Sequence, residues 1–171
     1  MITIEIIKRG EAKPLSNRRN QQDVVIEYVI ARSNGDIFTR IIGKRRLSGA
    51  EFTGGKFGAK YYSLTDLAPY ISQMPGISRN PSSSYLLKDA LPPNNNISGA
   101  IVAILRAEGV LMSSPPSVEN YAYTEVGYIS GCRSWRDPHY SIDRFLEDML
   151  DMDALEIVEV PESKVWRSPN R

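Results

Sequence analysis

A single dipeptide, Asn34-Gly35, limits what this chain can fold into more than any other feature of its sequence. It separates two runs rich in Val, Ile and aromatic residues, at 24–31 and 37–42. A two-residue type I′ turn needs positive φ at both central positions, and Asn-Gly adopts that conformation readily. We therefore predict a central β-hairpin in a mostly antiparallel sheet.

Other patterns place further strands around this hairpin. Ile2, Ile4 and Ile6 alternate with polar residues, which is typical of a half-buried strand. Residues 155–160 form a last β-rich run. Strands and helices do not alternate regularly along the chain, so we predict an α+β fold rather than a parallel α/β fold.

Three or four helices should pack against this sheet. The amphipathic segment around Phe145 gives the strongest helical pattern, and Asp137-Pro138 can supply its cap and first helical residue. Thr65 and Ser98 can cap two others. The predicted helices cover residues 66–74, 82–91, 99–108 and 137–151.

The composition is that of one globular domain. The 171 residues are 42% hydrophobic and 24% charged, close to globular averages. We expect a single domain over residues 1–171. Three parts should lie outside its core: an extended N-terminal segment at 10–22, a flexible loop at 43–60 and a polar C-terminal tail at 162–171.

Several classes of protein are disfavoured by what the chain contains. It has one cysteine, Cys132, and one histidine, His139, too few for a disulfide or a multi-Cys or multi-His zinc site, so no metal or cofactor is expected. Apolar runs fall well short of the ~20 residues of a spanning helix. The first residues lack the layout of a secretory signal. We expect a cytoplasmic protein, or one incorporated in an assembled particle, with no membrane partner.

Charge is distributed unevenly along the chain. Residues 1–60 carry 12 Lys and Arg against 6 Asp and Glu, whereas residues 61–171 carry 9 against 14. Such asymmetry suggests an electrostatic partner, either polyanionic or a second copy of the chain. The alternative is that the two sets of charges are scattered over a solvated surface and pair within the molecule.

These features lead to the hypothesis of a non-enzymatic structural subunit in a larger homo- or hetero-oligomer, of the type found in viral or phage connectors, tails or minor capsid components. Its partners would be neighbouring protein subunits. The expected contact groups on the basic side are Arg18, Arg19, Lys44, Arg45, Arg46, Phe52 and Phe57. Those on the acidic side are Asp148, Asp151, Asp153 and Trp166.

Two alternatives stay open. The basic N-terminal third could bind nucleic acid, because Lys and Arg that neutralise phosphates supply affinity independent of sequence. A hydrolase or transferase could use Cys132 as nucleophile, His139 as base and Asp137 as the orienting carboxylate. The glycine-rich stretch at 54–60 lacks the spacing of a phosphate-binding loop.

Overall fold

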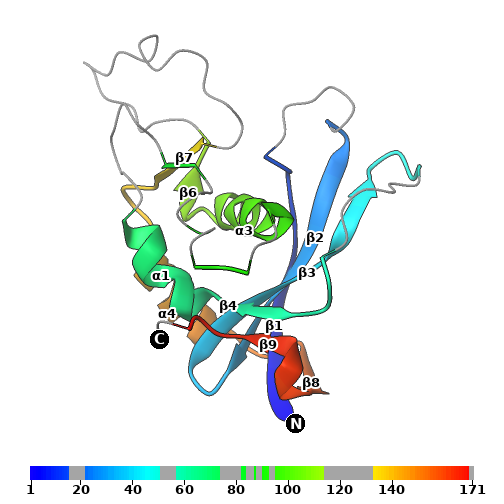
Figure 1. Ribbon diagram of the computed structural model, residues 1–171, viewed down its shortest axis with the longest axis vertical. Helices are drawn as coiled ribbons and strands as arrows, with labels where there is room; N and C mark the ends of the chain where they lie inside the picture. Colours follow the sequence, from blue (N-terminus) through cyan, green and yellow to red (C-terminus); the bar gives the residue numbers. More distant parts are fainter. Residues whose placement is uncertain are drawn as a thin grey trace.

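The computed structural model describes residues 1–15, 22–50, 57–73, 82–83, 87, 90–92, 95–113 and 133–169 (Figure 1). Its strands are β1 (Ile2–Ala12), β2 (Val24–Ser33), β3 (Asp36–Arg46), β4 (Tyr61–Ser63), β5 (Ser82–Ser83), β6 (Leu111–Met112), β7 (Arg133–Arg136), β8 (Glu156–Val160) and β9 (Val165–Trp166). The helices of the described part are α1 (Leu64–Ser72), α3 (Asn95–Ala107), α4 (Ile142–Leu150) and the 3-10 turn η3 (Glu162–Lys164). The fold is mixed α+β with a large, mostly antiparallel sheet, which confirms the predicted class.

The six-stranded sheet has the order β8-β1-β2-β3-β4-β9, and only its β4–β9 pair is parallel. The two outermost strands are joined by Pro161 and η3 alone. In a flat sheet they would lie about 24 Å apart. The linker spans roughly 18 Å even when fully extended. The sheet is therefore curled until its two edges approach each other (Figure 1).

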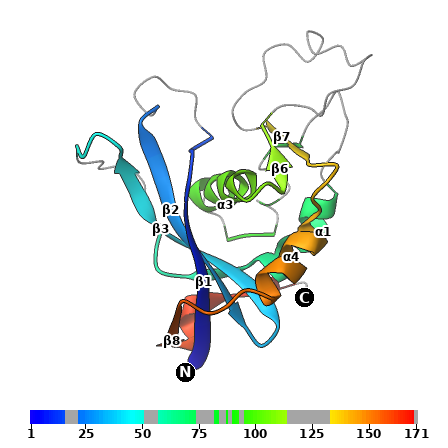
Figure 2. The same ribbon diagram turned by 180° about the vertical axis from the view of Figure 1, so that it is seen from behind.

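Two cores result from this curl, one on each face of the sheet. The helices α1, α3 and α4 pack on one face (Figures 1 and 2). The other face lines the inside of the curl and forms a smaller inner core. Successive strand residues point to opposite faces, so β2 sends Tyr28 and Ile30 to the helices and Val29 and Ala31 to the inner core. Burial on both faces explains its nearly continuous apolar sequence.

The first strand also sends side chains to both cores, and its alternation is interrupted once by an irregularity in register. Its pairing with β2 shifts between Ile6 and Lys8. Ile6 faces the inner core, and Ile7, the next residue, faces the helices. These two positions follow from ordinary alternation. Beyond the shift, Lys8, which binds Glu108, and Ala12 also lie on the helical face, so the β-bulge moves the even-numbered residues of β1 from the inner face to the helical face.

The strands β2 and β3 form the longest antiparallel pair. Ser33 pairs with Asp36 at its end, and between them Asn34 and Gly35 have φ values of 50° and 81°. The pairing reaches Val24 and Arg46, and β1 reaches Ala12. The segments at 10–22 and 43–60 therefore begin as strand, further than the sequence predicted, because all three strands continue to pair.

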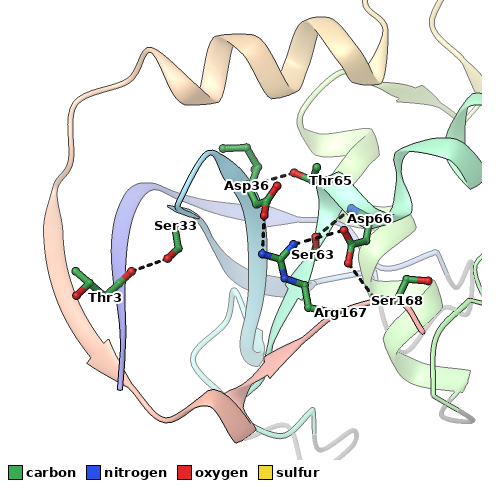
Figure 3. A network of polar contacts seen from close by, with 9 residues as sticks. Thr3, Ser33, Asp36, Ser63, Thr65, Asp66, Arg167 and Ser168 are labelled. Atoms are coloured by element: carbon green, nitrogen blue, oxygen red, sulfur yellow. Dashed lines mark hydrogen bonds and ion pairs between the residues drawn. The ribbon is translucent and has the colours of Figure 1, made fainter. Parts of the chain in front are cut away.

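Helix α1 begins earlier than predicted. Ser63 is its N-cap, and the Ser63 hydroxyl accepts a hydrogen bond from the Asp66 N–H at 3.0 Å. The Thr65 hydroxyl, expected to cap, accepts instead from the Ile37 N–H at 2.9 Å. It thereby ties the start of α1 to β3 (Figure 3).

Helix α4 begins later than predicted. Its N-cap is Ser141, whose hydroxyl accepts from the Arg144 N–H at 3.1 Å. The Asp137 carboxylate accepts from the His139 backbone N–H at 2.7 Å and forms a local turn instead of a helix cap.

The segment at 162–171, expected as a polar tail, is built into the fold as far as the structure describes it. Trp166 is only 8% exposed and packs against Tyr62 with ring centroids 6.0 Å apart. Arg167 forms ion pairs with Asp36 at 2.5 Å and Asp66 at 3.5 Å. The Ser168 N–H donates to the other Asp66 oxygen at 3.0 Å (Figure 3). These contacts fix β9 against β4 and α1.

None of the helices in the described ranges has the length and apolar character needed to cross a membrane.

Gly10 should tolerate no side chain, although β1 continues past it as a regular strand. A Cβ there would lie 2.6 Å from Cζ and Oη of Tyr28. That ring is buried beneath α3, close to the Glu108 carboxylate that binds Lys8 at 2.6 Å. Burial and Glu108 also raise the pKa of Tyr28. Because the ring cannot move freely, Gly10→Ala should lower the free energy of unfolding by about 1–3 kcal/mol in urea denaturation.

The matched control is Gly43→Ala, in β3. No atom lies within 4 Å of a Cβ built on Gly43. This variant should match the wild type or gain up to about 1 kcal/mol, because alanine restricts the unfolded chain more than glycine does. Equal stability of the two variants would contradict the close approach at Gly10.

Candidate functional site

One recess lined by the described residues lies where the two edges of the curled sheet fail to meet. We call this gap the seam; β8 forms one side, and Ala59, Tyr61 and Lys164 form the other. A pocket of about 420 Å³ opens into it. Its wall is mainly apolar, and its polar members are Arg9, Arg40, Glu156 and Lys164.

The pocket is the open end of the inner core. Alternation along β3 places residues 38 and 40 on the same face of the sheet, and Ile42, the extra residue where the β2–β3 register shifts, lines the pocket beside Arg40. Phe38 is fully buried, Arg40 is half-buried, and Ile42 is 47% exposed. Buried side chains therefore pack one end of the curl, and Arg40 lies at the boundary between this packed core and the open pocket.

Arg40 is the least satisfied polar group of this pocket. Its Nε is buried and has no hydrogen-bond partner among the described residues. Its guanidinium carbon lies 5.8 Å from the centre of the Tyr61 ring. Arg9, by contrast, forms an ion pair with Glu156 across the β1–β8 pair. With Lys164 exposed near Tyr61, the pocket carries a net positive charge.

A second feature of the seam is the outer edge of β8. One side of β8 pairs with β1, and no strand of the described part pairs with the other side (Figure 2). Three large apolar side chains are exposed on this strand or shortly before it in the sequence: Ile157 at 63%, Leu155 at 64% and Leu150, at the end of α4, at 41%. We call these three residues the edge patch.

Arg32 holds the parts of the edge patch together. Its Nε donates to Glu5 at 2.5 Å, and its Nη1 donates to the Leu150 carbonyl at 2.9 Å and to the carbonyl of Met152. Glu5 lies opposite Ile157 in the β1–β8 register. The end of α4 is thus fixed to β2 and, through Glu5, to β1, the neighbour of β8, and the carbonyls at its end are satisfied by a cation.

The basic residues 44–46, predicted as a contact surface, interact with other side chains of the same molecule. Arg45 pairs with both Glu11 and Glu27, which raise its pKa, and Arg46 pairs with Asp23 at 2.7 Å. The Lys44 ammonium lies 5.6 Å from the centre of the Phe57 ring, and burial lowers the pKa of Lys44.

Two of the predicted contact residues are core residues instead. Phe57 is 6% exposed and packs in the core on the helical face, as does Trp166. Both therefore belong to the interior rather than to a docking surface. Arg18, Arg19 and Phe52 lie outside the described residues.

The predicted acidic side is only partly at the surface. Asp148 accepts a hydrogen bond from the Tyr140 hydroxyl at 2.7 Å and lies 3.9 Å from Arg144. Asp151 and Asp153 are exposed between α4 and β8, close in sequence to the edge patch.

The three residues of the enzyme hypothesis are not brought together by any contact in the described structure. His139 is exposed, Asp137 binds its backbone N–H rather than its ring, and Cys132 lies outside the described residues. The described ranges also contain no group of three or more His, Cys, Asp or Glu that could hold a metal ion.

Sequence analysis did not select Arg40 or Ile157. For Arg40 a signal existed, because it shares the apolar face of a predicted strand with Phe38 and Ile42. For Ile157 there was none, since an apolar residue in a strand is expected to be buried.

Comparison with known proteins found no match to the chain among family models, curated proteins or solved structures. The fold is a curled α+β sheet with an open seam. The role of the protein is therefore inferred from the residues of this chain alone.

Arg32 should be a main support of the edge patch. Arg32→Gln removes the charged donor at the end of α4 and leaves Glu5 unpaired, so the free energy of unfolding should fall by about 1.5–3 kcal/mol. The control is Arg144→Gln, whose ion pair is exposed and long, with an expected change within about 0.5 kcal/mol. Urea denaturation measures both. If Arg32→Gln lowers the free energy of unfolding no more than Arg144→Gln does, the hydrogen bonds from Arg32 to the end of α4 contribute little to stability.

Proposed function

We propose that this protein is a non-enzymatic assembly subunit that associates with further copies of itself through the outer edge of β8 and the edge patch. One observation carries the proposal: β8 has a free edge, and the large apolar side chains of Ile157 on it and of Leu155 just before it are exposed. The unpaired N–H and C=O groups of an edge strand readily pair with a strand of another chain.

The carboxylates of β8 are arranged so that they do not block such pairing. Charged side chains usually protect an edge strand from association. Here Glu156 is bound to Arg9, and Glu159 accepts a hydrogen bond from the Thr3 hydroxyl at 2.6 Å. Both are drawn towards β1 and away from the free side.

The strand is also compatible with two-fold pairing to itself. An antiparallel pair centred at Ile157 sets the two Ile157 side chains opposite each other, Glu156 opposite Val158, and Glu159 opposite Leu155. No two carboxylates then face each other directly, which avoids the main repulsion of such a pair. The same patch serves both copies, as two-fold symmetry requires.

This proposal places the contact on an apolar edge rather than on opposite charges. The basic cluster at 44–46 is engaged in internal ion pairs and a ring contact. The exposed Asp151 and Asp153 supply a polar rim for the edge patch, as the borders of interfaces commonly do.

Nucleic-acid binding through the basic N-terminal third is the weaker alternative. Phosphates would have to compete with Glu11, Glu27 and Asp23 for Arg45 and Arg46. Binding that falls steeply as salt rises would favour this alternative.

Ile157→Lys tests the assembly proposal. A lysine there would face its own copy across the two-fold axis, so the dissociation constant of the assembly should rise by at least about tenfold. Light scattering and sedimentation over a range of concentrations report the mass relative to the 19.2 kDa monomer.

Leu47→Lys is the matched control. Leu47 is 59% exposed, just after the end of β3, so the same chemical change occurs away from the seam. It should assemble like the wild type, and circular dichroism should show both variants folded. A wild type that stays monomeric at every concentration, or an Ile157→Lys variant that assembles unchanged, would refute the proposal.

A further inference from the structure

We propose that the seam pocket binds a small monocarboxylate with an apolar chain, and that Arg40 is the residue that binds the carboxylate. This inference does not rest on self-association. It rests on the contents of the pocket: an apolar wall, a net positive charge and an arginine whose buried Nε has no partner in the part of the chain that the structure describes.

The size and wall of the pocket suit an apolar chain. Its volume of about 420 Å³ falls within the range of small-molecule sites, which are mostly apolar with a few placed polar groups. Val29 comes from β2, Val158 from β8 and Tyr61 from β4, so the wall is assembled from strands of both sheet edges. The strands that hold the wall also hold the inner core, which makes the site rigid.

Arg40 supplies the anchoring charge. Arg40 lines the pocket and is half-buried, so a carboxylate that reaches its guanidinium forms a charge-assisted hydrogen bond in partly dehydrated surroundings. The guanidinium is a planar fork that matches the two oxygens of a carboxylate. The nearby Tyr61 ring limits its orientation, so less freedom is lost when an anion binds.

The other charged groups favour an anion of single charge. Arg9 is already neutralised by Glu156. The half-buried Arg40 is then the cation inside the pocket, and Lys164 is exposed at the other side of the seam. A polyphosphate would meet the Glu156 carboxylate and an apolar wall that offers it no donors. A monocarboxylate uses both halves of the pocket.

Octanoate and octanamide provide the direct test on the wild-type chain. The two probes have nearly the same shape, but only octanoate carries a charge. Octanoate should bind at least about tenfold more tightly by calorimetry and should shift the NMR signals of Val29, Tyr61 and Val158. Acetate, which lacks the chain, should bind more weakly than octanoate because it leaves the wall uncovered. N-acetyl-leucine carries the carboxylate of a peptide C-terminus. Its affinity relative to that of octanoate tells whether the pocket prefers a peptide C-terminus or a fatty-acid-like ligand.

Arg40→Gln should weaken octanoate binding by at least about tenfold, whereas Arg144→Gln, on the exposed face of α4, should leave it unchanged. The same titration in Ile157→Lys should give wild-type affinity, because that side chain is not part of the pocket. Thus a failure of self-association and a failure of ligand binding can be read separately. Equal binding of octanamide and octanoate, unchanged binding in Arg40→Gln, or no saturable octanoate binding in the millimolar range would each overturn the inference.

Discussion

The closure of the curled sheet depends on a short contact: β9 pairs with β4, and Arg167 binds Asp36 and Asp66 beside it. Arg167 also lies 5.1 Å from the centre of the Phe38 ring, so this clamp covers the closed end of the inner core. With that end fixed, the linker through η3 holds β8 near the opposite edge. The inner core, the seam pocket and the free edge of β8 all follow from this arrangement.

The class of the fold could be predicted from the sequence because its signals are local. The alternation of Ile2, Ile4 and Ile6 and the apolar runs on both sides of Asn34-Gly35 depend on neighbouring residues alone. The start of α4 shows the limit of such signals. Asp137-Pro138 and Ser141 are both acceptable helix starts, and the turn that Asp137 forms with the His139 N–H decided between them.

The candidate site was harder to predict because it depends on pairs far apart in the sequence. A two-residue strand such as β9 has no periodicity, so Trp166 and Arg167 read as part of a polar tail. The charges at 44–46 read as a free basic cluster because their partners, Glu11, Glu27 and Asp23, become neighbours only when the strands pair. Arg45, on β3, pairs with Glu11 of β1 and Glu27 of β2, so these ion pairs favour one register of the three strands. A slip of one residue from that register would turn the side chains of a strand to the opposite face of the sheet.

The place of β1 in the sheet has a consequence for how the chain folds during synthesis. β1 lies between β2 and β8, yet in the sequence β8 follows all the described α-helices and every other described strand except β9. Helices α1 and α3 can therefore pack on β3 and β1 during synthesis while the inner face, with Ile4, Val29 and Phe38, is still uncovered. During that interval one side of β1 is an unpaired edge, the kind of surface that chaperones protect from aggregation. The slowest native contacts to form should be those of the longest sequence separation, between the first strand and the eighth.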